Sequence, residues 1–453
     1  MMSFDKMTLE ELIARPHVCG CGRVHEAPLQ FVRVGRKAVE SLPEALDSIG
    51  CSHPFIVCDV NTKKAAWDRV GAVLDSAGIP YQLHCIQQTH LEPDEQAVGE
   101  LCMMFDPSCD VVVALGSGVI NDCCKVFAHA AGRPQVIVGT APSMDGYASN
   151  CASMIIKQVK TTLYSDCPAA IIADTEIMKD APARMLWAGL GDMLAKYIAL
   201  CEWRIAHLIT GEYYCENVAA LMRRTLERIV AAAPRLMERD PEVIGAIAEG
   251  LILSGVAMAF AGVSRPASGQ EHYFSHVWEM FALSRGLPAE LHGIQVGVGT
   301  VLCFRLYERL LALQPDEERA RACMAAFDSK AWEARLRRVY GPAAQTLIDH
   351  EYSLWHKNDP EAHAQRLGRI IDSWPEIRRA IEALPQAENI LRLMAETGMP
   401  VRPEQIGESP QDVRDALITA RDTRDKYLTG SLLWDLGLLE DFAEWLAGVP
   451  ENG

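Results

Sequence analysis

DVVVALGSGVINDCCKVFAHAAGRPQVIVGTAPSMDGYAS, residues 110–149, is the stretch that decides the expected fold. Its first apolar run, Val111 to Leu115, is short, β-branched and followed by glycine, which is typical of a strand buried on both faces of a parallel sheet. The turn Gly116-Ser117-Gly118 comes next, and apolar residues then recur at helical spacing from Ile120. A helix that begins at such a turn directs backbone N–H groups toward an anion, and a diphosphate suits that position.

The second half of this stretch repeats the arrangement. Val136 to Gly139 is another strand-like run, and the polar segment Thr140 to Ser149 follows it. In open α/β sheets, ligands bind at the carboxyl ends of the strands. One Gly-x-Gly turn is a weak signal, but two such segments in succession favour a nucleotide-binding crevice.

Four further runs extend the alternation of strands and helices on both sides of this stretch. They are Phe31–Val34, Phe55–Asp59, Tyr81–Ile86 and Ala170–Ala173, and helical segments such as Lys63–Ala77 separate them. The pattern predicts a parallel, Rossmann-like sheet up to about Asp174. Asp59 ends its strand, where a carboxylate binds an adenosine ribose and repels a 2′-phosphate, which favours NAD over NADP. A helix cap is an equally good interpretation of Asp59.

The pattern changes to helices with few strand candidates after Ala181-Pro182. Helical segments are expected at 244–261, 319–340, 360–381 and 410–439. We therefore predict an α/β dinucleotide-binding domain over residues 1–180. An all-α domain that binds metal and substrate is predicted over residues 181–453.

Composition excludes several classes of function. The 453 residues carry a formal net charge of −17 with no basic run to offset it, which argues against nucleic acid as a partner. We identify no secretory signal and no stretch long and apolar enough to cross a bilayer, so no membrane insertion is expected. The 15 cysteines are scattered and odd in number, which favours reduced thiols and a cytoplasmic location.

One cysteine cluster lies near the start of the chain, in the segment HVCGCGRVH. It contains His17, Cys19, Cys21 and His25. Two thiols and two imidazoles can bind a metal, but a Cys-x-Cys pair without a second matching pair lacks the spacing of a zinc ribbon. The favoured interpretation is a glycine-rich loop with incidental cysteines, and a metal site is the alternative.

A second set of candidate metal ligands lies in the helical half. Asp192 falls on an otherwise apolar helix face, His272 and His276 are four residues apart on one face, and His292 follows. Buried carboxylates and imidazoles are costly unless paired, so such a set indicates a shared partner. Two imidazoles with one carboxylate leave positions open for substrate, as catalytic metal sites do. Tyr273 stands where a metalloprotease has its general-base glutamate, which disfavours that class.

The motifs GSGVIND, GTAPSMDGYAS, GLGDMLAK, SGQEHYFSH and LHGIQVGVGT together carry a resemblance. From about Phe31 to Leu439 the chain resembles the superfamily of iron-dependent alcohol dehydrogenases, glycerol dehydrogenases and dehydroquinate synthases. Within it, the chain resembles in particular the sn-glycerol-1-phosphate dehydrogenases of the bacterial arabinose-operon type. One departure is Ser117, where many members have a third glycine. The N-terminal cysteine loop lies outside the shared core.

The resemblance implies roles for individual residues. Metal ligands would be Asp192, His272 and His292, and substrate contacts would be Asp145, Asp192 and His276. The dinucleotide would be bound by Asp59, Gly116, Gly118, Val119, Ile120, Asn121, Asp122, Thr140, Ala141, Pro142, Ser143 and Ser149. The resemblance does not assign the cationic partners that a substrate phosphate needs; the candidates are Lys157, Arg265 and Arg424.

The resemblance also implies an activity. It is the reversible NAD(P)H-dependent reduction of dihydroxyacetone phosphate to sn-glycerol 1-phosphate, with one divalent nickel, zinc or iron ion, in a homodimer that serves phospholipid biosynthesis. A polyol dehydrogenase acting on unphosphorylated glycerol and a lyase of the dehydroquinate synthase kind are the enzymatic alternatives. A binding protein that has lost activity is disfavoured because the ligand set is intact.

Overall fold

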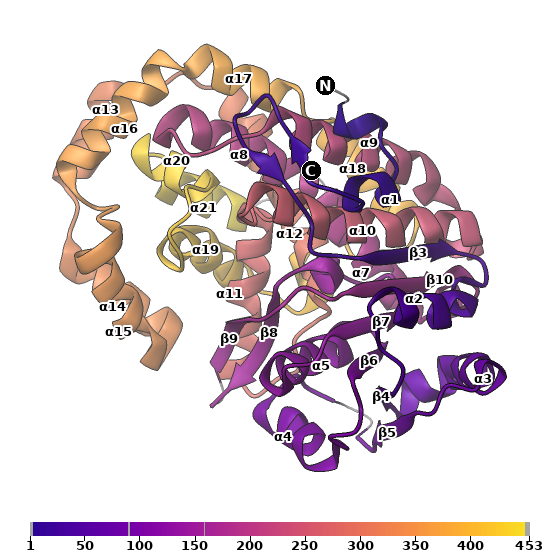
Figure 1. The fold of residues 1–453 in the computed structure, drawn as a ribbon. Coiled ribbons are helices and arrows are strands. Elements are labelled where there is room, and N and C mark those ends of the chain that lie inside the picture. The colour runs from indigo at the N-terminus through magenta and orange to yellow at the C-terminus, as the bar shows by residue number, and fades with distance from the viewer. Residues whose placement is uncertain (1–2, 89–90, 158, 449–453) are drawn as a thin grey trace. The chain divides into compact units, whose positions relative to one another are not determined.

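A computed structural model describes residues 3–88, 91–157 and 159–448 of the chain (Figure 1). It divides into two compact units. Unit 1 comprises residues 1–193 and 215–267, and unit 2 comprises residues 194–214 and 268–453. These units are defined by packing and do not show which parts of the chain fold independently. The domain boundary expected at residue 180 therefore stays a prediction.

Unit 1 is built on a six-stranded parallel sheet in the order β3-β10-β7-β6-β4-β5 (Figure 1). All six strands expected from the sequence are present, most of them one residue longer than expected. Their bounds are β3 Phe31–Gly35, β4 Pro54–Asp59, β5 Gln82–Ile86, β6 Val111–Gly116, β7 Gln135–Gly139 and β10 Ala170–Asp174.

Helices cover both faces of this sheet, which explains why β6 is apolar along its whole length and fully buried. On one face, Val70 and Leu74 of α3 (Val60–Ala77) join a core with strand residues such as Ile56. The helices η2 (Ala38–Ser41) and α2 (Leu42–Ser48) pack into the same core. On the other face lies α5 (Gly118–Ala131), whose Phe127 ring is 5.9 Å from that of Phe55. The predicted Rossmann-like arrangement is confirmed.

The remaining elements of unit 1 include two hairpins that the sequence did not predict. They are the antiparallel pairs β1 (His17–Val18) with β2 (Val24–His25), and β8 (Cys151–Ile156) with β9 (Val159–Tyr164). The helices are η1 Phe4–Lys6, α1 Leu9–Ile13, α4 Glu95–Met104, η3 Asp145–Ala148, α6 Thr175–Met178, α7 Ala183–Leu194, α9 Glu216–Ala232, η4 Ala233–Glu238 and α10 Pro241–Ala261.

Helix α10 contradicts the expectation that no stretch is long and apolar enough to cross a bilayer. Its length and hydropathy are sufficient for a membrane span. Of its most apolar 18-residue window, 72% is buried inside the structure. A helix that is apolar on all sides is found in a protein core as well as in a membrane. Its composition is therefore accounted for by burial in this fold.

Unit 2 is helical, and no strand occurs among its described residues. Its elements are α8 Lys196–Thr210, α11 Gln270–Ser284, α12 His292–Leu311, α13 Glu317–Ala325, α14 Ser329–Tyr340, η5 Gly341–Ala343, α15 Ala344–His350, the π-helical turn η6 Glu351–Trp355, α16 Pro360–Asp372, α17 Trp374–Glu382, α18 Ala387–Glu396, η7 Pro403–Ile406, α19 Pro410–Thr419, η8 Ala420–Asp422, α20 Thr429–Asp435 and α21 Leu439–Ala447. The expected helical character of this region is confirmed, although the segments expected at 319–340, 360–381 and 410–439 are each interrupted.

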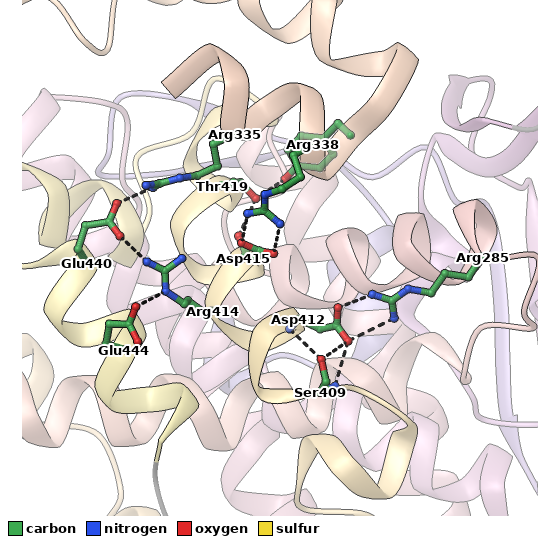
Figure 2. Close-up of polar contacts among 11 residues, drawn as sticks. Arg285, Arg335, Arg338, Ser409, Asp412, Arg414, Asp415, Thr419, Glu440 and Glu444 are labelled. Atoms are coloured by element: carbon green, nitrogen blue, oxygen red, sulfur yellow. Dashed lines mark hydrogen bonds and ion pairs between the residues drawn. The ribbon is translucent and has the colours of Figure 1, made fainter. Parts of the chain in front are cut away.

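Ion pairs join three helices of unit 2 (Figure 2). Arg338 on α14 bonds both carboxylate oxygens of Asp415 on α19, at 2.7 and 2.6 Å. Arg414, also on α19, bonds Glu444 on α21 at 2.5 Å. The two-pronged pair of Arg338 with Asp415 fixes the orientation of α14 relative to α19.

Candidate functional site

The ends of three neighbouring strands bring most of the predicted cofactor residues together in unit 1. Asp59 ends β4, Gly116 ends β6, and Thr140 follows β7; the backbone N–H of Thr140 donates to the Gly116 carbonyl at 3.0 Å. β5 lies on one side of β4 and β6 lies on the other, so the order of strands reverses at this point. Ligands of open α/β sheets bind at such a reversal, outside the carboxyl ends of the strands.

The glycine turn has a steric reason that the sequence alone did not give. A Cβ on Gly116 would come 2.5 Å from the Cβ of Ile120, so no larger residue fits there without a shift. Gly118 begins α5, and the preceding Ser117 makes no side-chain cap to the helix. The first N–H groups of α5 are therefore without a capping side chain from Ser117, as a helix start that receives a diphosphate requires.

Ser117 instead holds the loop that follows β7. Its hydroxyl lies 2.5 Å from that of Ser143 and 3.2 Å from that of Tyr147, and all three residues are buried. Ala141 and Pro142 belong to the same loop, and the Ala141 carbonyl accepts a hydrogen bond from the Tyr147 hydroxyl. The serine in place of a third glycine therefore has a structural role in this chain.

Lys125 also fixes this region, and sequence reasoning missed it. Its buried ammonium donates to the Gly146 carbonyl at 2.8 Å, to the Ser149 hydroxyl at 3.1 Å and to the Cys151 carbonyl at 3.1 Å. Burial lowers the pKa of Lys125, although the nearby Asp122 offsets part of that effect. The position of the predicted cofactor residue Ser149 thus depends on a lysine one helix away. A lysine on the apolar face of the predicted helix was the available signal.

The other predicted cofactor residues on α5 are placed mainly by packing. Ile120 and Asn121 are buried, and the Asn121 carbonyl accepts a hydrogen bond from Gln135 at 3.1 Å. Burial raises the pKa of Asp122, an effect that Lys125 opposes. Val119 is half-buried in the first turn of the helix.

Asp59 caps the N-terminus of helix α3, as the alternative interpretation of this residue predicted. One of its carboxylate oxygens, Oδ1, accepts hydrogen bonds from the backbone N–H groups of Asn61 and Thr62, both at 2.8 Å. This cap starts α3. Binding of a ribose by Asp59 stays a prediction.

Asp145 and Asp192 lie together in unit 1. The backbone N–H of Asp145 donates to the Asp192 carboxylate at 2.8 Å, and the Asp145 carboxylate accepts from the Ser254 hydroxyl at 2.8 Å. Asp192 is fully buried on α7. On the same helix, a Cβ on Gly189 would overlap the Pro142 carbonyl. The absence of a side chain at Gly189 therefore allows the loop after β7 to reach the helix that carries Asp192.

Three histidine rings cluster in unit 2. The ring centroids of His272 and His292 are 5.3 Å apart, and those of His276 and His292 are 5.6 Å apart. His272 and His276 share a face of α11, as their spacing predicted, while His292 begins α12. Two histidines assigned to metal and one assigned to substrate are thus neighbours.

Hydrogen bonds fix the orientation of the two predicted metal ligands. Nδ1 of His272 lies 2.8 Å from the Glu271 carboxylate, and Nδ1 of His292 lies 3.0 Å from the Ser275 hydroxyl. Because that hydroxyl donates to Gln295, it accepts from His292. Both rings are therefore protonated on Nδ1, and Nε2 carries the lone pair that binds a metal.

Sequence reasoning also missed Glu279. Its buried carboxylate lies 3.4 Å from Nδ1 of His292 and 3.6 Å from Nδ1 of His276. Burial lowers the pKa of His276 to about 3, although the Glu279 carboxylate opposes this effect. His276 is thus neutral at physiological pH. Glu279 lies three residues after His276 on α11, so helical spacing was the signal that could have found it.

The donor set fits a catalytic divalent metal. Two imidazoles with their Nδ1 atoms hydrogen-bonded and one buried carboxylate are typical ligands of zinc, nickel and iron. Asp192 belongs to unit 1, and the two histidines belong to unit 2. Their joint action as ligands stays a prediction.

Comparisons with known proteins support the fold described above. Residues 33–182 match the family described as iron-containing alcohol dehydrogenase. Glycerol dehydrogenase from Schizosaccharomyces pombe superposes with a TM-score of 0.60 at 14% identity, covering 92% of this chain and 90% of that one. Sulfoacetaldehyde reductase from Bifidobacterium kashiwanohense, solved in complex with NAD+, gives a TM-score of 0.58 at 14% identity, covering 94% and 99%. The fold is therefore that of the iron-containing alcohol dehydrogenases.

Sequence similarity identifies the family to which the chain belongs within this fold class. The glycerol-1-phosphate dehydrogenase [NAD(P)+] of Geobacillus stearothermophilus is 30% identical over 423 residues, which cover 92% of this chain and 95% of that protein. That of Halalkalibacterium halodurans is 36% identical over 295 residues, covering 64% and 74%. The chain belongs to the family of NAD(P)-dependent glycerol-1-phosphate dehydrogenases, as its motifs indicated.

Proposed function

We propose that this chain catalyses the NAD(P)H-dependent and metal-dependent reduction of dihydroxyacetone phosphate to sn-glycerol 1-phosphate, and the reverse oxidation. The observation that carries this proposal is the similarity to a glycerol-1-phosphate dehydrogenase along 95% of that protein's length. The glycine turn and the histidine pair support it, since a dehydrogenase of this class needs both a dinucleotide site and a metal site.

The dinucleotide would lie along the carboxyl edge of the sheet. Its diphosphate would lie against the first turn of α5, at Gly116, Gly118, Val119, Ile120, Asn121 and Asp122. The loop residues Thr140, Ala141, Pro142, Ser143 and Ser149 would line the rest of the site. Asp59 would bind the adenosine ribose through its second carboxylate oxygen, because the cap uses Oδ1. A carboxylate at this position favours NAD over NADP.

Asp192, His272 and His292 would hold the divalent ion, for which nickel or zinc is proposed, with iron as a further possibility. When bound, such a cation polarises a ketone oxygen and stabilises the negative charge that forms there during hydride transfer. Glu271 and Ser275 keep the two imidazoles in the tautomer that presents Nε2. Asp145 and the neutral His276 would contact the substrate, with Asp192 beside Asp145.

The cellular setting is a further part of the proposal. A cytoplasmic location is supported by the cysteines, since all 15 are thiols with no disulfide among them. A homodimer and a role in phospholipid biosynthesis follow from the family resemblance. Light scattering of the purified chain would measure the assembly.

A steady-state assay tests the proposed activity. Oxidation of NADH and of NADPH would be followed with dihydroxyacetone phosphate and with dihydroxyacetone, after loading the protein with nickel, zinc or iron. A clear preference for the phosphorylated ketone is expected. Preference for dihydroxyacetone would instead identify a polyol dehydrogenase, and absence of net NADH turnover would point to a lyase. Either result would reject the proposal.

A further inference from the structure

The fold assembles a second group of metal-binding side chains, entirely within unit 1. Cys19 and Cys21 lie in the turn between β1 and β2, His25 ends β2, and Cys215 immediately precedes α9. One ligand atom of each lies within 4.8 Å of one ligand atom of every other. Cys19 and Cys215 are 196 positions apart in the chain, so only the tertiary structure brings them together.

Three of the distances between these ligand atoms match those expected around a tetrahedrally coordinated zinc ion. The Sγ atoms of Cys19 and Cys215 are 3.7 Å apart, and Nε2 of His25 is 3.3 Å from Sγ of Cys21 and 3.6 Å from Sγ of Cys215. Zinc binds sulfur at about 2.3 Å and nitrogen at about 2.0 Å, so a tetrahedron requires about 3.8 Å between two sulfurs and about 3.5 Å between sulfur and nitrogen. A disulfide would need about 2.0 Å.

Surrounding groups orient the ligands. Nδ1 of His25 lies 2.7 Å from the Phe260 carbonyl, which can only accept, so Nδ1 carries the proton and Nε2 faces the thiols as an acceptor. The Asn217 side chain donates to Sγ of Cys19 at 3.2 Å, a bond that stabilises a thiolate. Three of the four ligands, Cys19, His25 and Cys215, are 6%, 0% and 1% exposed.

His17, considered with this cluster from the sequence, is not part of it. Its Nε2 lies 3.0 Å from the Leu12 carbonyl, and its ring packs on Phe4 with centroids 5.6 Å apart. Cys215 takes the fourth place. The expectation that the cysteines are incidental rested on the lack of a second matching cysteine pair near Cys19 and Cys21. Cys215 lies too far along the chain to be recognised from spacing.

We propose that Cys19, Cys21, His25 and Cys215 form a closed, structural zinc site that fastens the N-terminal hairpin to the start of α9. Three thiolates and one imidazole in a tetrahedron select zinc among the common divalent ions. Four protein ligands leave no position for substrate, so the site does no chemistry of its own. The inference does not depend on the proposed dehydrogenase activity, since none of its residues is assigned to that reaction.

X-ray absorption at the zinc edge tests the site directly. The full-length chain would be purified in the presence of a thiol reductant, both as the natural sequence and as His292→Ala, which removes a proposed ligand of the catalytic ion. In the His292→Ala protein we expect about one zinc per chain, bound by three sulfurs and one nitrogen. The variant His25→Cys, made on that background, should keep the zinc and shift its ligands to four sulfurs.

Zinc content of further variants completes the test. Cys215→Ser should lose the zinc and lower the melting temperature, whereas Cys102→Ser, which changes an exposed cysteine on α4, should keep both unchanged. Zinc bound only by nitrogen and oxygen, a zinc content unchanged by Cys215→Ser, or a Cys19–Cys215 disulfide in the reduced preparation would each overturn the proposal. If Cys215→Ser does not fold, the ligand counts from His292→Ala and from His25→Cys on that background still decide.

Discussion

The two units position their predicted functional residues by different means. In unit 1, hydrogen bonds such as those of Lys125 act together with close packing at Gly116, which ends β6, and at Gly189 on α7, where a methyl group would overlap a neighbour. In unit 2, side chains on two helices are held by hydrogen bonds, as between Glu271 and His272. We infer that unit 1 is most sensitive to added volume and unit 2 to the loss of a polar partner.

The largest effect is expected from His292→Ala in unit 2. Removing one of three proposed ligands should lower kcat/KM by about 10³-fold, because loss of a cation that stabilises the developing charge costs several kcal/mol. The metal at this site should be largely lost, while NADH affinity, measured by fluorescence titration, stays within about twofold. His350→Ala, on α15, is the matched control. Full activity of His292→Ala after chelator treatment would contradict the ligand assignment.

Glu271→Gln probes the polar support of unit 2 without changing side-chain volume. The hydrogen bond to Nδ1 of His272 would lose its negative charge, and metal affinity should fall about tenfold. Competition with a chelator of known affinity measures the change. Glu317→Gln, on the exposed first turn of α13, should leave the affinity as it is. Equal affinities in the two variants would mean that Glu271 has only a packing role.

Gly189→Ala tests the corresponding sensitivity of unit 1. The added Cβ overlaps the Pro142 carbonyl, so the loop after β7 must move, and we expect a loss of about 1–3 kcal/mol in the free energy of unfolding. NADH affinity should fall with it, because the loop carries predicted cofactor contacts. Gly99→Ala on α4, where nothing lies within 4 Å of the added atom, should instead stabilise by about 0.5–1 kcal/mol. Urea unfolding of both variants compares the two sites. A neutral Gly189→Ala would remove the proposed contrast between the units.

The smallest expected effect concerns the pH dependence of unit 2. Burial and the Asp412 charge raise the pKa of Glu408 to about 7, although Arg285 opposes them; Figure 2 shows how Arg285 and Ser409 hold Asp412. An acid with a raised pKa in the folded state loses stability as pH rises from its ordinary value toward about 7. Glu408→Gln should therefore stabilise the protein by about 1 kcal/mol at pH 8, after allowance for solvent screening, and have little effect at pH 4. Thermal unfolding at the two pH values measures the difference, and an equal effect at both would show that Glu408 ionises normally.

Prediction from sequence succeeded where a signal is local. The six strands of the parallel sheet were recognised from short apolar runs, because a strand buried on both faces must be apolar along its length. The start of α5 after the glycine turn was recognised for a similar reason. His272 and His276 were placed on one helix face because four residues make about one turn.

Prediction failed where partners are distant in the chain. Lys125 bonds carbonyl groups 21 and 26 residues away, and these partners could not be identified from any local pattern. The hairpin β8–β9 was missed for another reason: only Ala152 and Met154 of β8 are buried, and this alternation is too short to indicate a strand. No local pattern shows why residue 189 is glycine, whereas the structure shows that it is needed for the close approach of Pro142.

The sequence by itself determined the order of the elements, the glycine turn and the chemical types available for binding, because these depend on neighbouring residues and on periodicity. The tertiary structure alone decided that α9 and α10 belong to the same unit as the sheet and that Glu279 lies beside His292. It also decided that Cys215 completes the cysteine cluster. Contacts between residues far apart in the chain arise from the packing of whole elements, and spacing along the sequence carries no measure of that packing.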